Sequence, residues 1–246
     1  MAEHSITITE VFLIVAGGIV PTLIWLWFWL KEDKKRPEPG RLIMMCFTAG
    51  FLSVAVAIIA EGMIQGMTNQ FFPGKIIIPI ALFALTEEIV KYLAVYLIAF
   101  RNKNFDEPID AIVYMITGAL GFSAMENILY ITAAIQQSGP LLGVIAGNLR
   151  FVGATLLHIA TSGIVGIAIG LAFYMNAKRK HTHLVAGLIT ASLLHTIFNL
   201  SIISTKNIGD ILFVFLILWL VIVIMMLFFE KVKKVRPETS IPLSTQ

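Results

Sequence analysis

Six ionisable side chains lie inside long apolar stretches of the sequence, together with two asparagines. The six are Glu87, Glu88, Lys91, Glu126, His158 and His195, and the asparagines are Asn127 and Asn199. A charged side chain at the centre of a bilayer costs about 2.5–3.5 kcal/mol even on a lenient scale. Three carboxylates accompany a single lysine in this set. A fold retains such uncompensated charge where a proton, a metal or a substrate completes a site.

Glutamates and histidines in a pocket shielded from bulk solvent are suited to activating one water molecule. A buried glutamate can act as a general base near neutral pH, while histidine and asparagine donate hydrogen bonds to a developing oxyanion. Two histidines and one glutamate can also hold Zn²⁺ with an open fourth position. The sequence contains no Ser-His-Asp elbow, Walker loop or H-E-x-x-H motif. The predicted chemistry is hydrolysis, with the need for a metal left open.

Helical spacing predicts how these residues face one another. Glu87 and Glu88 precede Lys91 by four and three residues, so the lysine lies beneath both carboxylates on one helical face. His195 and Asn199 share another face through the same four-residue spacing. We therefore expect Lys91 to hold the glutamate pair in place.

The elements that position these residues are predicted to be membrane-spanning helices. Of the 246 residues, 58% are hydrophobic and 13% are charged, against roughly 45–50% and 25% in soluble proteins. A helix of about 20 apolar residues crosses a bilayer, and the sequence has seven such runs, at 11–30, 42–60, 76–100, 109–135, 152–175, 184–203 and 211–229. Basic residues stand in short clusters between these runs, which excludes a nucleic-acid-binding surface. The prediction is an all-α membrane bundle in one domain, residues 1–246, with its motif-bearing core at 76–203.

The distribution of lysine and arginine predicts an orientation in the bilayer. Fourteen of the 18 basic residues lie on one side of the seven runs and three on the other. Because basic connections stay cytoplasmic, the N-terminus is predicted outside and the C-terminus in the cytoplasm. At 1.5 Å per residue, the polar residues then lie at depths that agree within about 9 Å. We expect one polar layer in the outer half of the membrane.

One connection departs from this simple pattern. Residues 139–150 are moderately apolar, and a helix running from there to residue 175 would be about 54 Å long. We expect a break, a kink or a re-entrant turn on the outer side. The small-residue spacings Gly62/Gly66 and Gly166/Gly170 are predicted to serve helix packing.

Four blocks of residues in order resemble the PrsW family of intramembrane proteases. The first is Glu87-Glu88-x-x-Lys91, and the last is His195-x-x-x-Asn199. Between them stand Asp110-x-x-x-Tyr114, continuing through Gly121-Phe122-x-x-x-Glu126-Asn127 to Tyr130, and then Arg150 followed by His158. The resemblance covers about residues 86–199, whereas the first and last predicted helices match only in being transmembrane.

The resemblance implies an enzyme that cuts membrane-anchored regulators, notably anti-sigma factors, on the extracytoplasmic side of a prokaryotic plasma membrane. The more distantly related CAAX prenyl endopeptidases have histidine where this chain has Glu126, which favours PrsW. PrsW proteases are commonly classed as metalloproteases, while the CAAX relatives are regarded as glutamate-dependent. One divalent metal, such as zinc, therefore stays an open expectation.

The leading hypothesis is an intramembrane peptidase with a role for each polar residue. Glu87 or Glu88 activates a water, and His195 with Asn199 stabilises the oxyanion. His158 and Glu126 position the water or, with His195, a metal. The expected supporting residues are Lys91, Asn127 and Arg150, the last of which pairs with Glu126 or meets the substrate.

Two other classes of function remain open on the sequence. Carboxylates and histidines also carry protons through membrane bundles, so a proton- or ion-coupled transporter is one alternative. A non-catalytic scaffold that binds transmembrane segments is the other, because the same pocket would serve it. The expected partners are a membrane-anchored protein substrate and the lipid bilayer, and the oligomeric state is left open.

Overall fold

The computed structural model describes residues 6–31 and 37–237, which form helices and no strand. In chain order the helices are α1 (Ile8–Leu30), α2 (Gly40–Phe71), α3 (Ile77–Val95), a π-helical turn η1 (Tyr96–Phe100), α4 (Asp110–Ser138), α5 (Pro140–Val152), α6 (Ala154–Leu171), α7 (Ala177–Ser204) and α8 (Ile208–Val232). The all-α prediction is confirmed for this part of the chain. Residues 1–5, 32–36 and 238–246 of the predicted domain lie outside it.

Among the described residues, six helical stretches are long and apolar enough to cross a membrane, with α5 and α6 counted together. The third predicted run forms α3 and η1 but is not among the six. The reason is composition, because the 19 residues of α3 include Glu87, Glu88 and Lys91. The second run is also longer than predicted, since α2 continues past residue 60 to Phe71.

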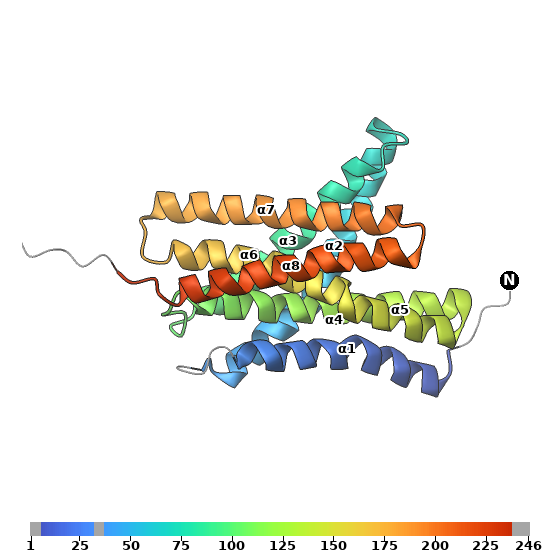
Figure 1. Cartoon of the computed structure of the whole chain (residues 1–246), viewed down its shortest axis with the longest axis horizontal. Coiled ribbons are helices and arrows are strands. Elements are labelled where there is room, and N and C mark those ends of the chain that lie inside the picture. The colour runs from blue at the N-terminus through green and yellow to red at the C-terminus, as the bar shows by residue number, and fades with distance from the viewer. Residues whose placement is uncertain (1–5, 32–36, 238–246) are drawn as a thin grey trace, which may run out of the picture.

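The centre of the bundle is α4, with α1, α2 and α6 packed along it (Figure 1). Every residue of α4 from Asp110 to Ala124 is buried. A helix that is apolar and buried on all sides forms the core of such a bundle. The connected ends of α2 and α3 lean away from the other helices (Figure 1). The polar residues of α3 and α4 are thus placed on rigid, well-packed elements.

Two glycines allow α2 to approach α4 closely. A Cβ atom at Gly50 would lie 1.9 Å from the backbone oxygen of Gly118, and one at Gly121 would lie 1.9 Å from that of Phe47. These distances leave no room for a side chain unless the two helices separate. Close backbone approach through small residues is a general way to pack helices in membranes.

Gly121→Ala is therefore expected to lower the free energy of unfolding by about 1–3 kcal/mol, the usual cost of overpacking. Gly62→Ala is the matched control, because no heavy atom lies within 4 Å of a Cβ at Gly62. The predicted packing role of Gly62 is therefore absent from the described residues. The control should be neutral or slightly stabilising, since alanine favours the helix. Thermal unfolding in detergent micelles measures both, and equal midpoints for the two variants would contradict the packing argument.

Two glycines also interrupt the chain where a break was expected. Gly139, with φ of +85°, ends α4, and Gly153 separates α5 from α6. A side chain at Gly153 would meet the ring of Phe215 in α8, 2.6 Å from its Cβ. The expected interruption is confirmed, and residues 139–175 do not form one continuous helix.

A cluster of carboxylates, separate from the six ionisable residues singled out in the sequence, lies at the end of α4 that is opposite to Gly139. The hydroxyl of Tyr114 donates a hydrogen bond to Glu38, which precedes α2. Asp110 accepts hydrogen bonds from the backbone N–H groups of Asp106 and Glu107 at 2.9 and 2.7 Å. Burial raises the pKa of Glu38, and the Tyr114 hydrogen bond opposes this effect. The cluster fastens the start of α2 to the start of α4.

Candidate active site and metal centre

Four helices bring the six ionisable residues into one connected cluster. Glu87, Glu88 and Lys91 come from α3, Glu126 from α4, His158 from α6 and His195 from α7. All except Glu126 are buried, and the side chain of Glu126 is 24% exposed. Direct contacts between these helices agree with the polar layer that was expected from the depth of each residue.

Glu88 is the fully buried anchor of the cluster. Its Oε1 accepts a hydrogen bond from Lys91 Nζ at 2.6 Å and lies 2.9 Å from His195 Nδ1. An ionised carboxylate only accepts hydrogen bonds, so His195 carries a proton on Nδ1. In neutral His195 the lone pair is then on Nε2, on the side of Glu87. Glu88 thus sets the tautomer of His195 and neutralises Lys91.

His158 is held from both sides. Its Nδ1 lies 2.9 Å from Lys91 Nζ, and its Nε2 lies 2.8 Å from Glu126 Oε2. Because an ammonium group only donates, Nδ1 accepts from Lys91 and Nε2–H donates to Glu126. Lys91 therefore bridges Glu88 and His158 rather than holding both glutamates of α3.

Arg150 connects α5 to this network. Its Nη2 donates to Glu126 Oε2 at 2.8 Å and its Nε donates to Asn127 Oδ1 at 2.6 Å. The guanidinium also lies 4.0 Å from the ring centroid of Tyr130. Asn127 in turn donates to Thr155 Oγ1 in α6 at 3.1 Å. Arg150 thus fixes the carboxylate of Glu126, which in turn orients His158. The sequence left open whether Arg150 pairs with Glu126 or meets the substrate, and the structure has the pairing with Glu126.

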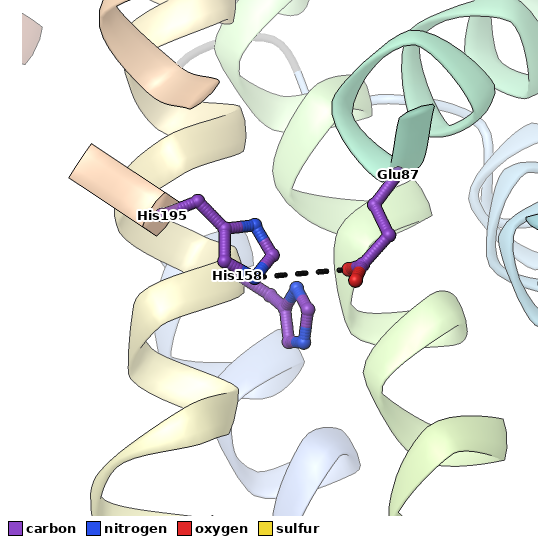
Figure 2. A group of neighbouring side chains, drawn as sticks. All are labelled: Glu87, His158 and His195. Atoms are coloured by element: carbon purple, nitrogen blue, oxygen red, sulfur yellow. Dashed lines mark ion pairs between the residues drawn. The ribbon is translucent and has the colours of Figure 1, made fainter. Parts of the chain in front are cut away.

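Glu87 differs from Glu88 in that its carboxylate accepts no hydrogen bond from a described residue, whereas Glu88 accepts two through Oε1. Oε2 is buried without a hydrogen-bond partner in both residues, and the Oε2 of Glu87 lies on the side of His195. The nearest ring nitrogen, His195 Nε2, is 3.8 Å away (Figure 2). A buried oxygen without a hydrogen bond is costly, so this position favours a bound water or ion between Glu87 and the histidines.

A chamber of about 530 Å³ is lined by Glu87. Its polar lining comprises Glu61, Glu87, Glu126, Tyr130, Arg150, His158, His195 and Asn199, and its apolar lining includes Ile80, Phe83, Phe198, Ile202 and Phe215. Glu88 and Lys91 lie outside this lining. Glu87 can therefore contact a molecule bound in the chamber, whereas Glu88 lies outside the lining and holds Lys91 and His195 in position.

Sequence reasoning missed Glu61 as a chamber residue. The second predicted run ends at residue 60, which leaves Glu61 at its edge. In the structure α2 continues through Glu61 to Phe71. The available signal was the absence of proline between residues 42 and 72, which lets one helix continue beyond the apolar run.

Three side chains are placed to share a metal ion. One donor atom from each of Glu87, His158 and His195 lies within 4.8 Å of the other two, and all three residues are buried. Glu87 Oε2 and His195 Nε2 are free to bind, whereas His158 must first exchange one of its two hydrogen bonds. The set of two nitrogens and one oxygen matches catalytic zinc sites. The carboxylate in this group is Glu87, while Glu126, the expected ligand, is engaged with Arg150.

Comparisons with known proteins give one consistent family. Residues 38–228 match the family described as "PrsW family intramembrane metalloprotease". The chain is similar to "Protease PrsW" of Geobacillus kaustophilus strain HTA426, with 27% identity over 85% of this chain and 88% of that protein. It is also similar to the proteins of the same name from Oceanobacillus iheyensis, at 29% identity over 85% and 92%, and from Bacillus subtilis, at 24% over 80% and 85%. No solved structure matches the chain.

Proposed function

We propose a catalytic arrangement for this chain, which belongs to the PrsW family of intramembrane metalloproteases. The chain is an intramembrane protease and an integral protein of the bacterial plasma membrane. The proposal rests on one observation: Glu87, unlike Glu88, lines the chamber, and its buried Oε2 has no hydrogen-bond partner and lies 3.8 Å from the unprotonated nitrogen of His195. We infer that the reacting water is held between these two side chains.

The metal that the family description implies would be held by Glu87, His158 and His195, a set that the free atoms of Glu87 and His195 support. When bound, a divalent ion such as zinc lowers the pKa of its water and polarises the scissile carbonyl. Lys91 and Glu126 each hydrogen-bond one of the two nitrogens of His158. His158 would release one of them as it takes up the ion.

Glu87 accepts the proton of the attacking water. A carboxylate has two oxygens, so one can receive this proton while the other faces the histidines. The water oxygen bonds to the peptide carbon, and Asn199, which lines the chamber, donates its amide N–H to the developing oxyanion. The carbon–nitrogen bond then breaks, and Glu87 returns the proton to the departing amine nitrogen.

The remaining residues position these groups. Glu88 holds the tautomer of His195. Lys91 lies between the carboxylate of Glu88 and the imidazole of His158 and hydrogen-bonds both. Arg150 and Asn127 hold Glu126 against His158. Mutating a residue that orients a metal ligand in this way often lowers metal affinity or activity by about 10–100-fold.

We further infer that α3 is a seventh membrane-crossing helix, with the N-terminus outside and the C-terminus in the cytoplasm. The three charges that lower its apolar character are turned into the bundle rather than toward lipid, which supports this topology. The chamber then lies in the outer half of the membrane. Its apolar wall suits a membrane-anchored protein segment, and an anti-sigma-factor-like regulator is the proposed substrate.

The test is a search for new peptide ends. Purified protein is incubated with bacterial membranes, and the peptides are analysed by mass spectrometry for wild type and the Glu87→Gln variant, each with and without a chelator. New ends near the outer boundary of single-span proteins, absent from the folded variant, are expected. Identical peptides from both proteins would contradict the catalytic proposal and favour a scaffold. Loss of cleavage with chelator would support the metal.

A further inference from the structure

A second cavity lies at the opposite end of the bundle from the active-site chamber. It has a volume of about 540 Å³ and is formed by α6, α7 and α8. Its lining includes Ile167, Ala186, Gly187, Thr190, Met225 and Phe228, and no glutamate or aspartate. Gly187 packs closely on α6, where a Cβ would lie 2.7 Å from that of Ala168, and the small side chain of Ala186 lines the groove beside it. This apolar groove is independent of the residues proposed for catalysis.

The dimensions of the groove suit one hydrocarbon chain. Its lining on α7 runs from Thr182 to Thr190, which is about 12 Å along a helix at 1.5 Å per residue. One leaflet of a bilayer contributes about 15 Å of hydrocarbon, half of the total thickness. The groove therefore follows most of the depth of one leaflet.

Basic residues of α7 and α8 lie next to one end of the groove. On α7, Lys178 and Arg179 precede Thr182 and His183 of the lining by one helical turn, which places them on the same face. On α8, Lys231 Nζ lies 5.6 Å from the ring centroid of Phe228, which lines the groove. The nearby carboxylate of Glu230 forms an ion pair with Lys233 at 2.7 Å.

We propose that this groove binds an anionic phospholipid, with one acyl chain against α6 and the phosphate between Lys178, Arg179 and Lys231. Basic pockets between membrane helices recognise anionic head groups, and each basic residue contributes about fivefold in binding. A second copy of this chain is a poorer occupant, because it would bring the same positive charges to the contact. The length of the groove therefore suits an acyl chain, and the positive charge at its end favours a negative head group.

Native mass spectrometry of the detergent-purified full chain tests the head-group preference, with phosphatidylglycerol and phosphatidylcholine as probes. Wild type is expected to retain phosphatidylglycerol at least about fivefold more strongly. The K178Q/R179Q/K231Q variant should lose that preference, and the matched control R101Q/K103Q, at the same end of the bundle, should keep it. Equal binding of the two lipids by wild type would overturn the proposal.

A groove-filling pair tests the acyl-chain position separately. A186F should lose bound phosphatidylglycerol, whereas I189F should retain it, because Ile189 is exposed and does not line the groove. Retention by A186F would overturn the assignment of the groove, and a mass corresponding to two chains in place of lipid would favour a second copy. If A186F does not fold, the charge variants decide the outcome. Proteolytic activity is not the readout, so failure here leaves the catalytic proposal intact.

Discussion

Replacing Glu87 with glutamine is expected to lower the rate of peptide-bond hydrolysis by about 100- to 10,000-fold, the usual contribution of a general base. Glu87 lines the chamber, and its buried Oε2 has no hydrogen-bond partner among the described residues. Glutamine has nearly the same shape but cannot accept the proton of the water. Cleavage of a single-span substrate in proteoliposomes, followed under single-turnover conditions, measures the effect.

Glu88→Gln is the matched comparison, because it makes the same chemical change one residue away. Glu88 is engaged with Lys91 and His195 instead of the chamber. Removing one partner of a buried ion pair costs about 3–5 kcal/mol, because the other charge is left uncompensated. Glu88→Gln should therefore lower the unfolding midpoint clearly, whereas Glu87→Gln should leave it near the wild-type value. Equal stability losses, or full activity in Glu87→Gln, would contradict the proposed division of roles.

The second large effect concerns the metal. Wild-type protein is expected to bind about one zinc per chain, as a three-ligand site with an open fourth position. His195→Ala should lose most of this binding, because it removes the nitrogen that Glu88 directs toward Glu87. Elemental analysis after dialysis against a defined zinc concentration gives the stoichiometry without relying on activity.

His183→Ala is the control for this experiment, since His183 is half-buried near the basic end of the bundle and does not line the active-site chamber. It should keep both the zinc content and the cleavage rate of wild type. Chelator treatment should abolish wild-type cleavage, and added zinc should restore it. A wild-type protein that stays fully active with no bound metal would instead support water activation by glutamate alone.

The class of protein could be predicted from the sequence, and so could the residues proposed for the site. Long apolar runs must form helices in a membrane, because every backbone polar group has to be satisfied within the segment. Charged side chains inside such runs are costly, which is why Glu87, His158 and His195 stood out without any structure. The break near Gly139 also followed from helix length, and the family was recognisable from the spacing of its blocks.

Which of the two glutamates lines the chamber depends on how the helices pack. Glu87 and Glu88 are adjacent, and successive residues on a helix point about 100° apart. Spacing alone places both near Lys91, but the crossing of α3 with α6 and α7 turns Glu88 onto Lys91 and His195 and places Glu87 in the chamber lining. The position of Glu61 likewise depended on how far α2 continues and where it leans. These contacts join residues far apart in the chain, and helix packing, which local periodicity does not encode, sets them.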